Sequence, residues 1–341
     1  MSYSMALTAD PPSCYFVDMR LRKTSPQDPG ITRIRRGRGF EYRDASGVHV
    51  SDDDELTRIR ALAIPPAWQD VWICARPNGH LQAIGIDGAG RTQYLYHADW
   101  SRRTAARKFD RALALSERLP AVRRRVTLDL RRDGFVRERV LAGAFRLLDT
   151  ALLRVGSERY AQENGTVGLT TLRGEHVVVD GATVALSFIG KSGEPWERTF
   201  DDPDLAALLA ELTQRGPEAQ VLSWHDGEGW HRLRPADVND DLRALAGADT
   251  SVKDVRTLRG TTIAARTLAR WGVEATDAAR KRAIAAASRE AAAALGNTPS
   301  VARGSYIDPR VIDRYEHGVV VADGTIAHVE GQLAGLIGGR S

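Results

Sequence analysis

The sequence predicts an α+β protein with a small β-rich N-terminal domain at residues 1–98 and a larger, mainly helical domain at residues 99–341. Three observations lead to this prediction. Short apolar or aromatic runs separated by turn signals fill the chain as far as Tyr96, helical periodicity dominates after His97, and four short runs divided by glycine turns interrupt it between residues 166 and 200. The last feature predicts a small antiparallel sheet inside the helical domain.

In the first domain we expect extended segments at residues 40–43, 71–75, 81–86 and 93–96. Turn signals at residues 77–79 and 87–90 separate the later ones. One helix is expected among them. Ser51 precedes four consecutive acids and predicts the N-terminal cap, and Pro65 predicts that the helix stops after Ile64.

In the second domain, Ser101 is expected to cap a basic helix that runs to about residue 119. Pro120 is expected to open another helix to about residue 133, and a third at 136–155 should end at Gly156. Strands are expected at 166–172, 176–179, 184–189 and 196–200, and further helices at 205–214, 254–271 and 276–295.

Positive charge is segregated along the chain. The formal net charge is only +4, yet thirteen basic residues stand against five acidic ones between Arg102 and Val140. A second cluster comprises Arg33, Arg35, Arg36 and Arg38. Concentrated arginine is typical of proteins that bind a polyanion, because neutralised phosphates release counterions. A solvated helix face explains the same charges equally well.

Several classes of function lack the residues they need. Cys14 and Cys74 are too few for a disulfide framework or a thiolate metal site, and His225 and His231 flank a glycine-rich turn without a third ligand. No glycine-rich phosphate loop occurs, and no apolar run has the length of a membrane span. We therefore expect a cytoplasmic protein without a membrane partner, which acts through side chains alone, without metal or cofactor.

Four segments of the helical domain stand out together, at residues 153–160, 188–193, 253–257 and 296–306. They contain Arg154, Lys191, Arg256 and Tyr306. Taken singly, each has an ordinary structural explanation, such as a helix-terminal cation or a hairpin charge. Lysine occurs at only five positions, against 43 arginines, so a retained Lys191 hints at a task for which the side chain must release a proton.

In order and spacing these segments resemble the active-site series of type IB DNA topoisomerases, in particular the poxvirus-like bacterial branch. Residues 64–68, 84–87 and 90–96 resemble the β domain of that family, and residues 163–169 follow the first arginine motif as they do there. The resemblance covers nearly the whole chain. It implies the fold that type IB topoisomerases share with tyrosine recombinases. It also implies relaxation of supercoiled double-stranded DNA through a transient 3′-phosphotyrosyl bond, without ATP or metal.

Residue by residue, the resemblance makes Tyr306 the nucleophile, Arg154 and Arg256 phosphate clamps, and Lys191 a general acid. Asn297 replaces the histidine that the family usually has nine residues before the tyrosine. Its amide can donate a hydrogen bond to a phosphate oxygen but cannot carry positive charge. We therefore expect a site whose activity is altered rather than abolished. The expected DNA contacts are Gln93, Tyr94, Tyr96, Arg102, Arg103, Arg107, Lys108, Arg159 and Tyr160.

The residue types suit this chemistry. A phenol of reference pKa about 10 attacks, and the departing 5′ alkoxide is a stronger base that needs a proton, which an ammonium group supplies better than a guanidinium. Two alternatives remain, a tyrosine site-specific recombinase and a non-catalytic DNA-binding protein. For the topoisomerase that the resemblance implies, we expect a monomer bound to double-stranded DNA and associated with the nucleoid. Plasmid relaxation without ATP or metal distinguishes the three.

Overall fold

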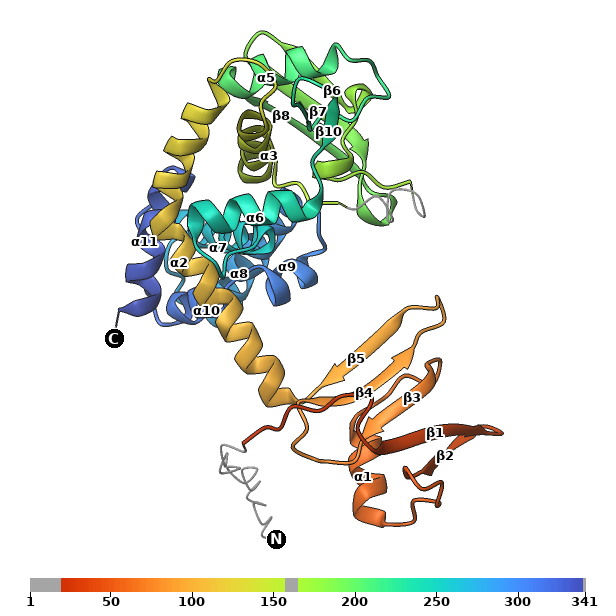
Figure 1. Ribbon diagram of the computed structural model, residues 1–341. Coiled ribbons are helices and arrows are strands. Elements are labelled where there is room, and N and C mark those ends of the chain that lie inside the picture. The colour runs from red at the N-terminus through yellow and green to blue at the C-terminus, as the bar shows by residue number, and fades with distance from the viewer. Residues whose placement is uncertain (1–19, 157–164, 340–341) are drawn as a thin grey trace. The chain divides into compact units, whose positions relative to one another are not determined.

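The computed structural model describes residues 20–156 and 165–339 and divides the chain into two compact units, Met1–Ala106 and Arg107–Ser341 (Figure 1). Helices and small antiparallel sheets make up both units, which confirms the mixed α+β prediction. The domain division expected after residue 98 falls at the start of helix α2 (Ala98–Leu130), and the division between the compact units falls further along that helix.

The first unit is built on a five-stranded antiparallel sheet with the order β2-β1-β3-β4-β5. Four strands lie where they are predicted, within two residues at either end. The five are β1 (Gly30–Arg36), β2 (Gly39–Arg43), β3 (Gln69–Cys74), β4 (Leu81–Ile86) and β5 (Thr92–Tyr96). A small core of Ile31, Ile59, Val71, Ile73 and Ala83 lies beneath the sheet.

Strand β1 is missing from the sequence prediction because its arginines suggest a polyanion site instead. The inward positions of β1 are Ile31 and Arg33, and the Arg33 guanidinium donates to the backbone carbonyls of Ile64, Pro65 and Trp68 at 2.7–3.2 Å. Arg33 is therefore a structural residue that ties the sheet to the loop after helix α1. The exposed Arg36 pairs with Glu41 across the hairpin.

Helix α1 spans Asp53–Ala61, and both of its predicted ends need correction. Asp52, rather than Ser51, is the N-cap, and its carboxylate accepts from the Glu55 N–H at 2.8 Å. Serine and aspartate cap equally well, so the pattern alone does not decide between them. The helix also stops before Ile64, because Ala63 adopts a left-handed conformation with φ 48°.

Helix α2 is one continuous helix, whereas a break was predicted at Pro120. The apolar stripe of Leu115, Leu119, Val122 and Val126 is buried on both sides of the proline. Packing of this stripe against the core outweighs the hydrogen bond that proline cannot donate. The helix also begins before the predicted cap, since the Ser101 N–H already bonds to the His97 carbonyl.

Most basic residues of the arginine-rich stretch have partners inside the second unit, a role that the charge count does not predict. Their acceptors lie on six helices of that unit. The pairs are Lys108 with the Ser305 carbonyl, Arg111 with Asp254, Arg118 with the Ala246 carbonyl, Arg123 with Asp149 and Glu330, Arg131 with Asp204, Arg137 with Asp237, and Arg139 with Glu211.

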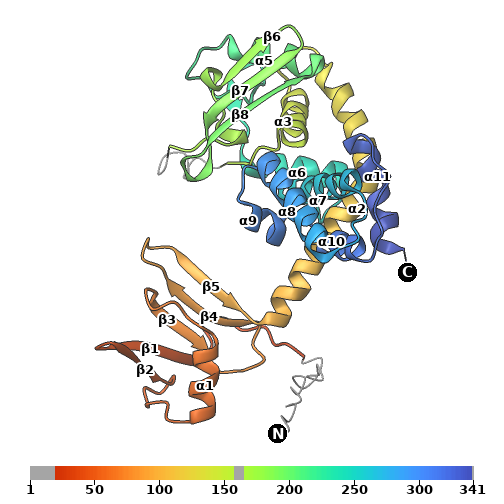
Figure 2. The ribbon, with the colours of Figure 1, turned by 180° about the vertical axis from the view of Figure 1, so that it is seen from behind.

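The second unit surrounds one continuous apolar core, and helix α3 lies between the three-stranded sheet and helices α6 and α7 (Figure 2). The sheet order is β6-β7-β8, antiparallel throughout. The elements are α3 (Arg137–Ala151), β6 (Val177–Asp180), β7 (Thr183–Ile189), β8 (Pro195–Asp201), α5 (Pro203–Thr213), β9 (Ser223–His225), β10 (Trp230–Arg232), α6 (Pro235–Ala246), α7 (Val252–Trp271), α8 (Asp277–Leu295), α9 (Pro299–Ser305), α10 (Pro309–Glu316) and α11 (Ile326–Gly338).

Two further predictions in this unit are wrong. Residues 166–172 do not form a strand; they contain a 3₁₀ turn at Leu169–Thr171, whose polar groups pair with the chain that leaves α3. Helix α3 ends at Ala151 instead of residue 155, because Leu152 turns left-handed at φ 56°. Across the described ranges, no helix combines the length and apolarity needed to cross a membrane.

A buried ionic network joins α2, α3, α7 and α11. The Arg123 guanidinium contacts Asp149 at 2.7 Å and Glu330 at 2.8 Å, and Arg259 contacts the same two carboxylates at 2.6 Å and 3.7 Å. Burial by itself would raise the pKa of Asp149, but the hydrogen bonds and charges of the two arginines outweigh burial and lower it.

We expect Arg123→Met to lower the free energy of unfolding by about 3–5 kcal/mol, since it leaves two buried carboxylates short of a cation. Urea unfolding measures this, and the exposed neighbour substitution Arg124→Met should stay within about 0.5 kcal/mol of wild type. A carboxylate whose pKa is lowered by folding, such as Asp149, stabilises the fold above about pH 4, and this stabilisation is lost as the pH falls. Acid unfolding of Arg123→Met should therefore begin at a higher pH; equal acid midpoints would contradict this account.

Candidate active site

Arg256 is a buried cation without a carboxylate partner among the described contacts. It lies in the second turn of α7, and only 3% of its surface is exposed. Its guanidinium donates to the carbonyl of Leu152 and, at 2.7 Å, to that of Leu295, while its Nε finds no partner. Burial lowers the pKa of Arg256 to about 10, so the group is still protonated at neutral pH.

Arg154 follows directly from the turn that ends α3. Leu152 takes the left-handed conformation that offers its carbonyl to Arg256, and the next residue, Leu153, is buried. The Arg154 carbonyl accepts from the Leu169 N–H at 2.8 Å. Gly168 permits this approach, because a Cβ there would stand 2.6 Å from the Gly156 Cα. The backbone of the first arginine motif is thereby fixed against residues 168–170.

Asn297 is held beside Arg154 by the end of helix α8. Arg154 Nη2 donates to the Gly296 carbonyl at 2.7 Å and to Asn297 Oδ1 at 2.5 Å. Gly296 ends α8 in the left-handed conformation, and the Asn297 N–H closes the turn onto the Ala292 carbonyl at 3.0 Å. A Cβ at Gly296 would lie 2.0 Å from Trp196, so only glycine fits. The side-chain amide nitrogen of Asn297, Nδ2, is buried and has no hydrogen-bond partner among the described residues.

Tyr306 lies immediately after the short helix α9 and next to Arg256. The Arg256 Cζ is 5.5 Å from the centre of the Tyr306 ring. Gly260 lets α7 pack closely here, since a Cβ on it would come within 2.8 Å of the Tyr306 carbonyl oxygen. That oxygen accepts a hydrogen bond from Thr261 Oγ1 at 3.1 Å.

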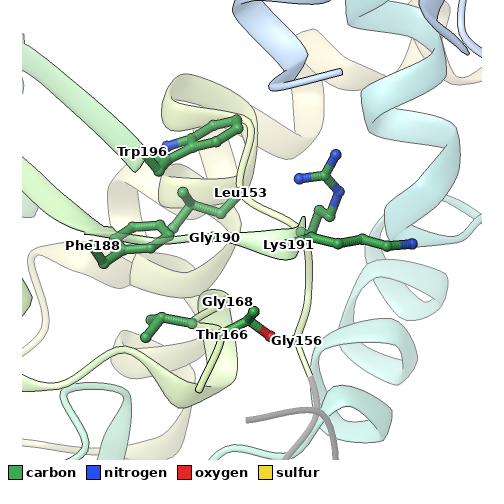
Figure 3. A pocket seen from close by; sticks show the side chains of 10 residues that line it. Leu153, Gly156, Thr166, Gly168, Phe188, Gly190, Lys191 and Trp196 are labelled. Atoms are coloured by element: carbon green, nitrogen blue, oxygen red, sulfur yellow. The ribbon is translucent and has the colours of Figure 1, made fainter. Parts of the chain in front are cut away.

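Lys191 stands at the end of the β-hairpin. It begins a 3₁₀ turn after β7 and is exposed, and it lines a pocket of about 230 Å³ together with Arg154, Phe188 and Trp196. Figure 3 shows its amine extending away from Phe188 and Trp196. The structure thus brings Arg154, Arg256, Asn297 and Tyr306 into one chain of contacts and Lys191 to the same pocket as Arg154. Tyr306 does not line that pocket.

Unsatisfied donors gather at this place. Within residues 20–156 and 165–339, five buried side-chain nitrogen or oxygen atoms lack a hydrogen-bond partner, and three of them are nitrogens of Trp196, Arg256 and Asn297. Buried polar groups are normally paired, so such a group of donors indicates a ligand that accepts hydrogen bonds. Two guanidinium groups beside these donors favour an anion such as a phosphodiester. Among the described residues, no three metal-ligating side chains come together.

The expected DNA contacts are distributed over both units. Tyr94 and Tyr96 are 50% and 46% exposed on β5 and stack with their ring centres 6.1 Å apart, which confirms that they share one face. Gln93 alternates with these tyrosines along β5, and its side chain donates a hydrogen bond to Asp87 at 2.9 Å. Arg102, Arg103 and Arg107 are exposed on α2, Arg102 being paired with Asp99, and the Lys108 ammonium group donates to the Ser305 carbonyl. Arg159 and Tyr160 lie outside the described residues.

Sequence reasoning missed the residues that pack the site together, Trp196, Gly260, Thr261 and Gly296. A glycine in the middle of a helix is unfavourable unless something needs the space, so Gly260 was a signal that could have been used. Gly296 follows the predicted end of a helix and signals only a cap. Nothing in the local sequence links either glycine to the aromatic ring or the backbone that approaches it.

Comparison with known proteins decides the family. The family model for the catalytic core of eukaryotic DNA topoisomerase I matches residues 98–330, and that for the N-terminal domain of bacterial DNA topoisomerase IB matches residues 39–87. The chain belongs to the type IB DNA topoisomerases. This confirms the resemblance inferred from the motifs.

Viral topoisomerases are similar over most of their length. DNA topoisomerase 1B of Acanthamoeba polyphaga mimivirus is 28% identical over 295 residues, which cover 84% of this chain and 88% of the relative. DNA topoisomerase 1B of vaccinia virus (strain Copenhagen) is 23% identical over 288 residues, covering 77% and 83%. DNA topoisomerase 1 of rabbit fibroma virus is 22% identical over 314 residues, covering 82% and 90%.

The turn that presents Asn297 can be tested with Gly296→Ala. We expect slower single-turnover DNA cleavage and a lower free energy of unfolding, because the new methyl group collides with Trp196 in addition to straining the backbone. Gly181→Ala is the matched control: Gly181 has the same φ of 58°, with open space around its missing Cβ. It should show only the backbone cost of about 1–2 kcal/mol and normal cleavage. Equal cleavage rates for the two variants would disprove the packing argument.

Proposed function

We propose that Tyr306 is the nucleophile with which this topoisomerase cuts and reseals one strand of double-stranded DNA. The phenol oxygen forms a bond to the phosphorus as the bond to the 5′ oxygen breaks, which leaves a 3′-phosphotyrosyl link and a free 5′ hydroxyl. The attack in reverse restores the strand, and because the link conserves the phosphoester energy, no ATP is needed. The supporting observation is the position of Tyr306 beside Arg256 and the unpaired buried donors.

Arg256, Arg154 and Asn297 are proposed to bind the non-bridging oxygens of the scissile phosphate. Charge on these oxygens grows as phosphorus becomes five-coordinate, and donors held in advance stabilise that charge without having to reorganise. Arg256 is the most buried of the three, and two backbone carbonyls hold its guanidinium. Asn297 offers Nδ2 while Oδ1 is bonded to Arg154, so one amide can both orient an arginine and donate to phosphate.

Lys191 is proposed as the general acid that protonates the departing 5′ oxygen. An ammonium group on an exposed turn beside Arg154 can reach a duplex bound over the pocket. The phenol proton leaves to solvent, and the same lysine accepts its proton back from the 5′ hydroxyl during religation. Exposure of the amine agrees with the closing of the site by DNA rather than by protein.

The remaining assignments follow from family membership and the surface residues. We propose that the tyrosine recombinase-like description applies to the catalytic fold, that residues 1–98 form a DNA clamp domain, and that Gln93, Tyr94, Tyr96, Arg102, Arg103, Arg107, Arg159 and Tyr160 contact DNA. The enzyme is proposed to be a bacterial, cytoplasmic monomer associated with the nucleoid. The recombinase alternative is less well supported, since the matched families are topoisomerases.

We expect Tyr306→Phe to bind DNA normally and to form no covalent adduct, because only the nucleophilic oxygen is removed. Trapping of labelled DNA on a denaturing gel measures the adduct, and relaxation of a supercoiled plasmid with chelator present and ATP absent measures turnover. Wild type should relax the plasmid under these conditions. An adduct at the wild-type level in Tyr306→Phe would assign the nucleophile to another residue.

Lys191→Ala should slow cleavage about a hundredfold to ten-thousandfold, the usual contribution of a general acid, with little change in DNA affinity. A substrate with sulfur in place of the bridging 5′ oxygen has a leaving group that needs no proton, so the variant should recover most of its rate on it. Arg256→Ala is the comparison and should stay slow on both substrates. Equal deficits of Lys191→Ala on oxygen and sulfur would make Lys191 a phosphate clamp instead.

A further inference from the structure

Lys108 differs from its exposed neighbours on α2. Its side chain is half-buried, and its ammonium nitrogen lies 2.8 Å from the carbonyl oxygen of Ser305, 197 positions along the chain. Ser305 is the last residue of helix α9, and Tyr306 follows it. The sequence grouped Lys108 with Arg102, Arg103 and Arg107 as a phosphate contact, yet its charge is directed at the peptide group that precedes the proposed nucleophile.

That peptide group is held at both of its polar atoms. Its oxygen, from Ser305, accepts from Lys108, and its nitrogen, from Tyr306, donates to the Ala302 carbonyl at 2.8 Å. A cation is favourable at this point because the last carbonyls of a helix lack partners within it. Without Lys108, the carbonyl that begins the tyrosine turn would lose its charged donor.

The peptide group after Tyr306 is held in the same way. Its oxygen, from Tyr306, lies 3.1 Å from Thr261 Oγ1, whose proton it shares with the Thr257 carbonyl at 2.9 Å, and its nitrogen, from Ile307, donates to the Ala302 carbonyl at 3.0 Å. With both flanking peptide planes bonded, the φ and ψ angles of Tyr306 are set, and only its side-chain torsions remain free. Of the four bonds, the one from Lys108 reaches the turn from α2.

A second contact ties the same turn to α2. Arg310 bonds to Asp110 of α2 at 2.8 Å and to Asp308 at 2.7 Å, two residues after the tyrosine. The position is unfavourable for the charged form of Lys108: burial lowers its pKa, and the charge of Lys253 on α7 lowers that pKa further. A lysine whose only task is to neutralise DNA phosphate would be placed better in water.

We propose that Lys108 is a positioning residue for the nucleophile, which holds the Ser305 carbonyl so that the Tyr306 phenol is aligned with the scissile phosphate. The inference rests on the proposed role of Tyr306 in cleavage. Lys108 touches neither the phosphate nor the leaving oxygen in this scheme. It acts through the backbone of the tyrosine turn, from the helix that continues into the N-terminal unit.

The test is Lys108→Met, which keeps the length and apolar stem of the side chain and removes the donor. Single-turnover cleavage at saturating DNA should fall about tenfold to a hundredfold, the effect expected from a small misplacement of a reacting group. DNA affinity and the slope of log affinity against log salt should stay at their wild-type values. Lys108→Arg, which keeps a charged donor, should recover part of the rate.

Lys281→Met, on an exposed position of α8, is the control for loss of one lysine and should behave as wild type. The sulfur-containing substrate separates Lys108 from the general acid, since it should not rescue Lys108→Met. Thermal unfolding checks that each variant is folded, and Lys108→Gln, whose amide is too short to reach the same carbonyl, replaces Lys108→Met if the latter does not fold.

Two outcomes would overturn the inference: wild-type cleavage by Lys108→Met, or rescue of the variant by the sulfur-containing substrate. If the normal rate comes with a salt slope reduced by about 0.9, the sign of one lost phosphate contact, Lys108 is a phosphate contact instead. Failure of the proposed function is seen separately. If Tyr306→Phe still forms the adduct, the nucleophile is misassigned; if it forms none while Lys108→Met cleaves normally, only the positioning role is wrong.

Discussion

The site depends on one constraint: Arg256 is buried, and its hydrogen-bond partners are backbone carbonyls. Its charge is taken out of water at a cost that lowers its pKa, and no carboxylate in the described contacts neutralises it. The carbonyls come from Leu152 and Leu295, at the ends of α3 and α8, so the same contacts that hold the cation also place the segments that bear Arg154 and Asn297. An anion bound here would complete the charge balance that folding leaves open.

Two pairs of arginines in the second unit differ in whether their partners carry a negative charge. Arg123 and Arg259 contact Asp149 and Glu330 and hold four helices together with their charge satisfied. Arg154, like Arg256, is bonded to carbonyl or amide oxygens, which orient a guanidinium without cancelling its charge. Count and clustering of basic residues do not make this distinction, because it depends on which acceptors the fold brings to each side chain.

Much of the secondary structure could be predicted, since period-two alternation, caps and glycine turns are local. Strand β4 was predicted to the residue, and helices α7 and α8 within two residues at each end. The misses share one cause, competition from distant contacts. Burial of the apolar stripe around Pro120 keeps α2 continuous. Residues 166–172 form hydrogen bonds with the backbone of residues 154 and 155 instead of forming a strand. The segment with Arg33, which was interpreted as a binding site, is a strand because the Arg33 side chain is buried.

The sequence by itself determined the family and named the candidate residues, because their types and order along the chain are sufficient to indicate phosphoryl transfer through a tyrosine. Only the tertiary structure decided what each does to its neighbours: that Asn297 bonds to Arg154, and that Lys108 lies against the peptide before Tyr306. These contacts join residues more than a hundred positions apart, and a hydrogen bond requires its two atoms within about 3 Å. No local sequence pattern predicts that two such distant residues lie this close, because only the packing of the core brings their helices together.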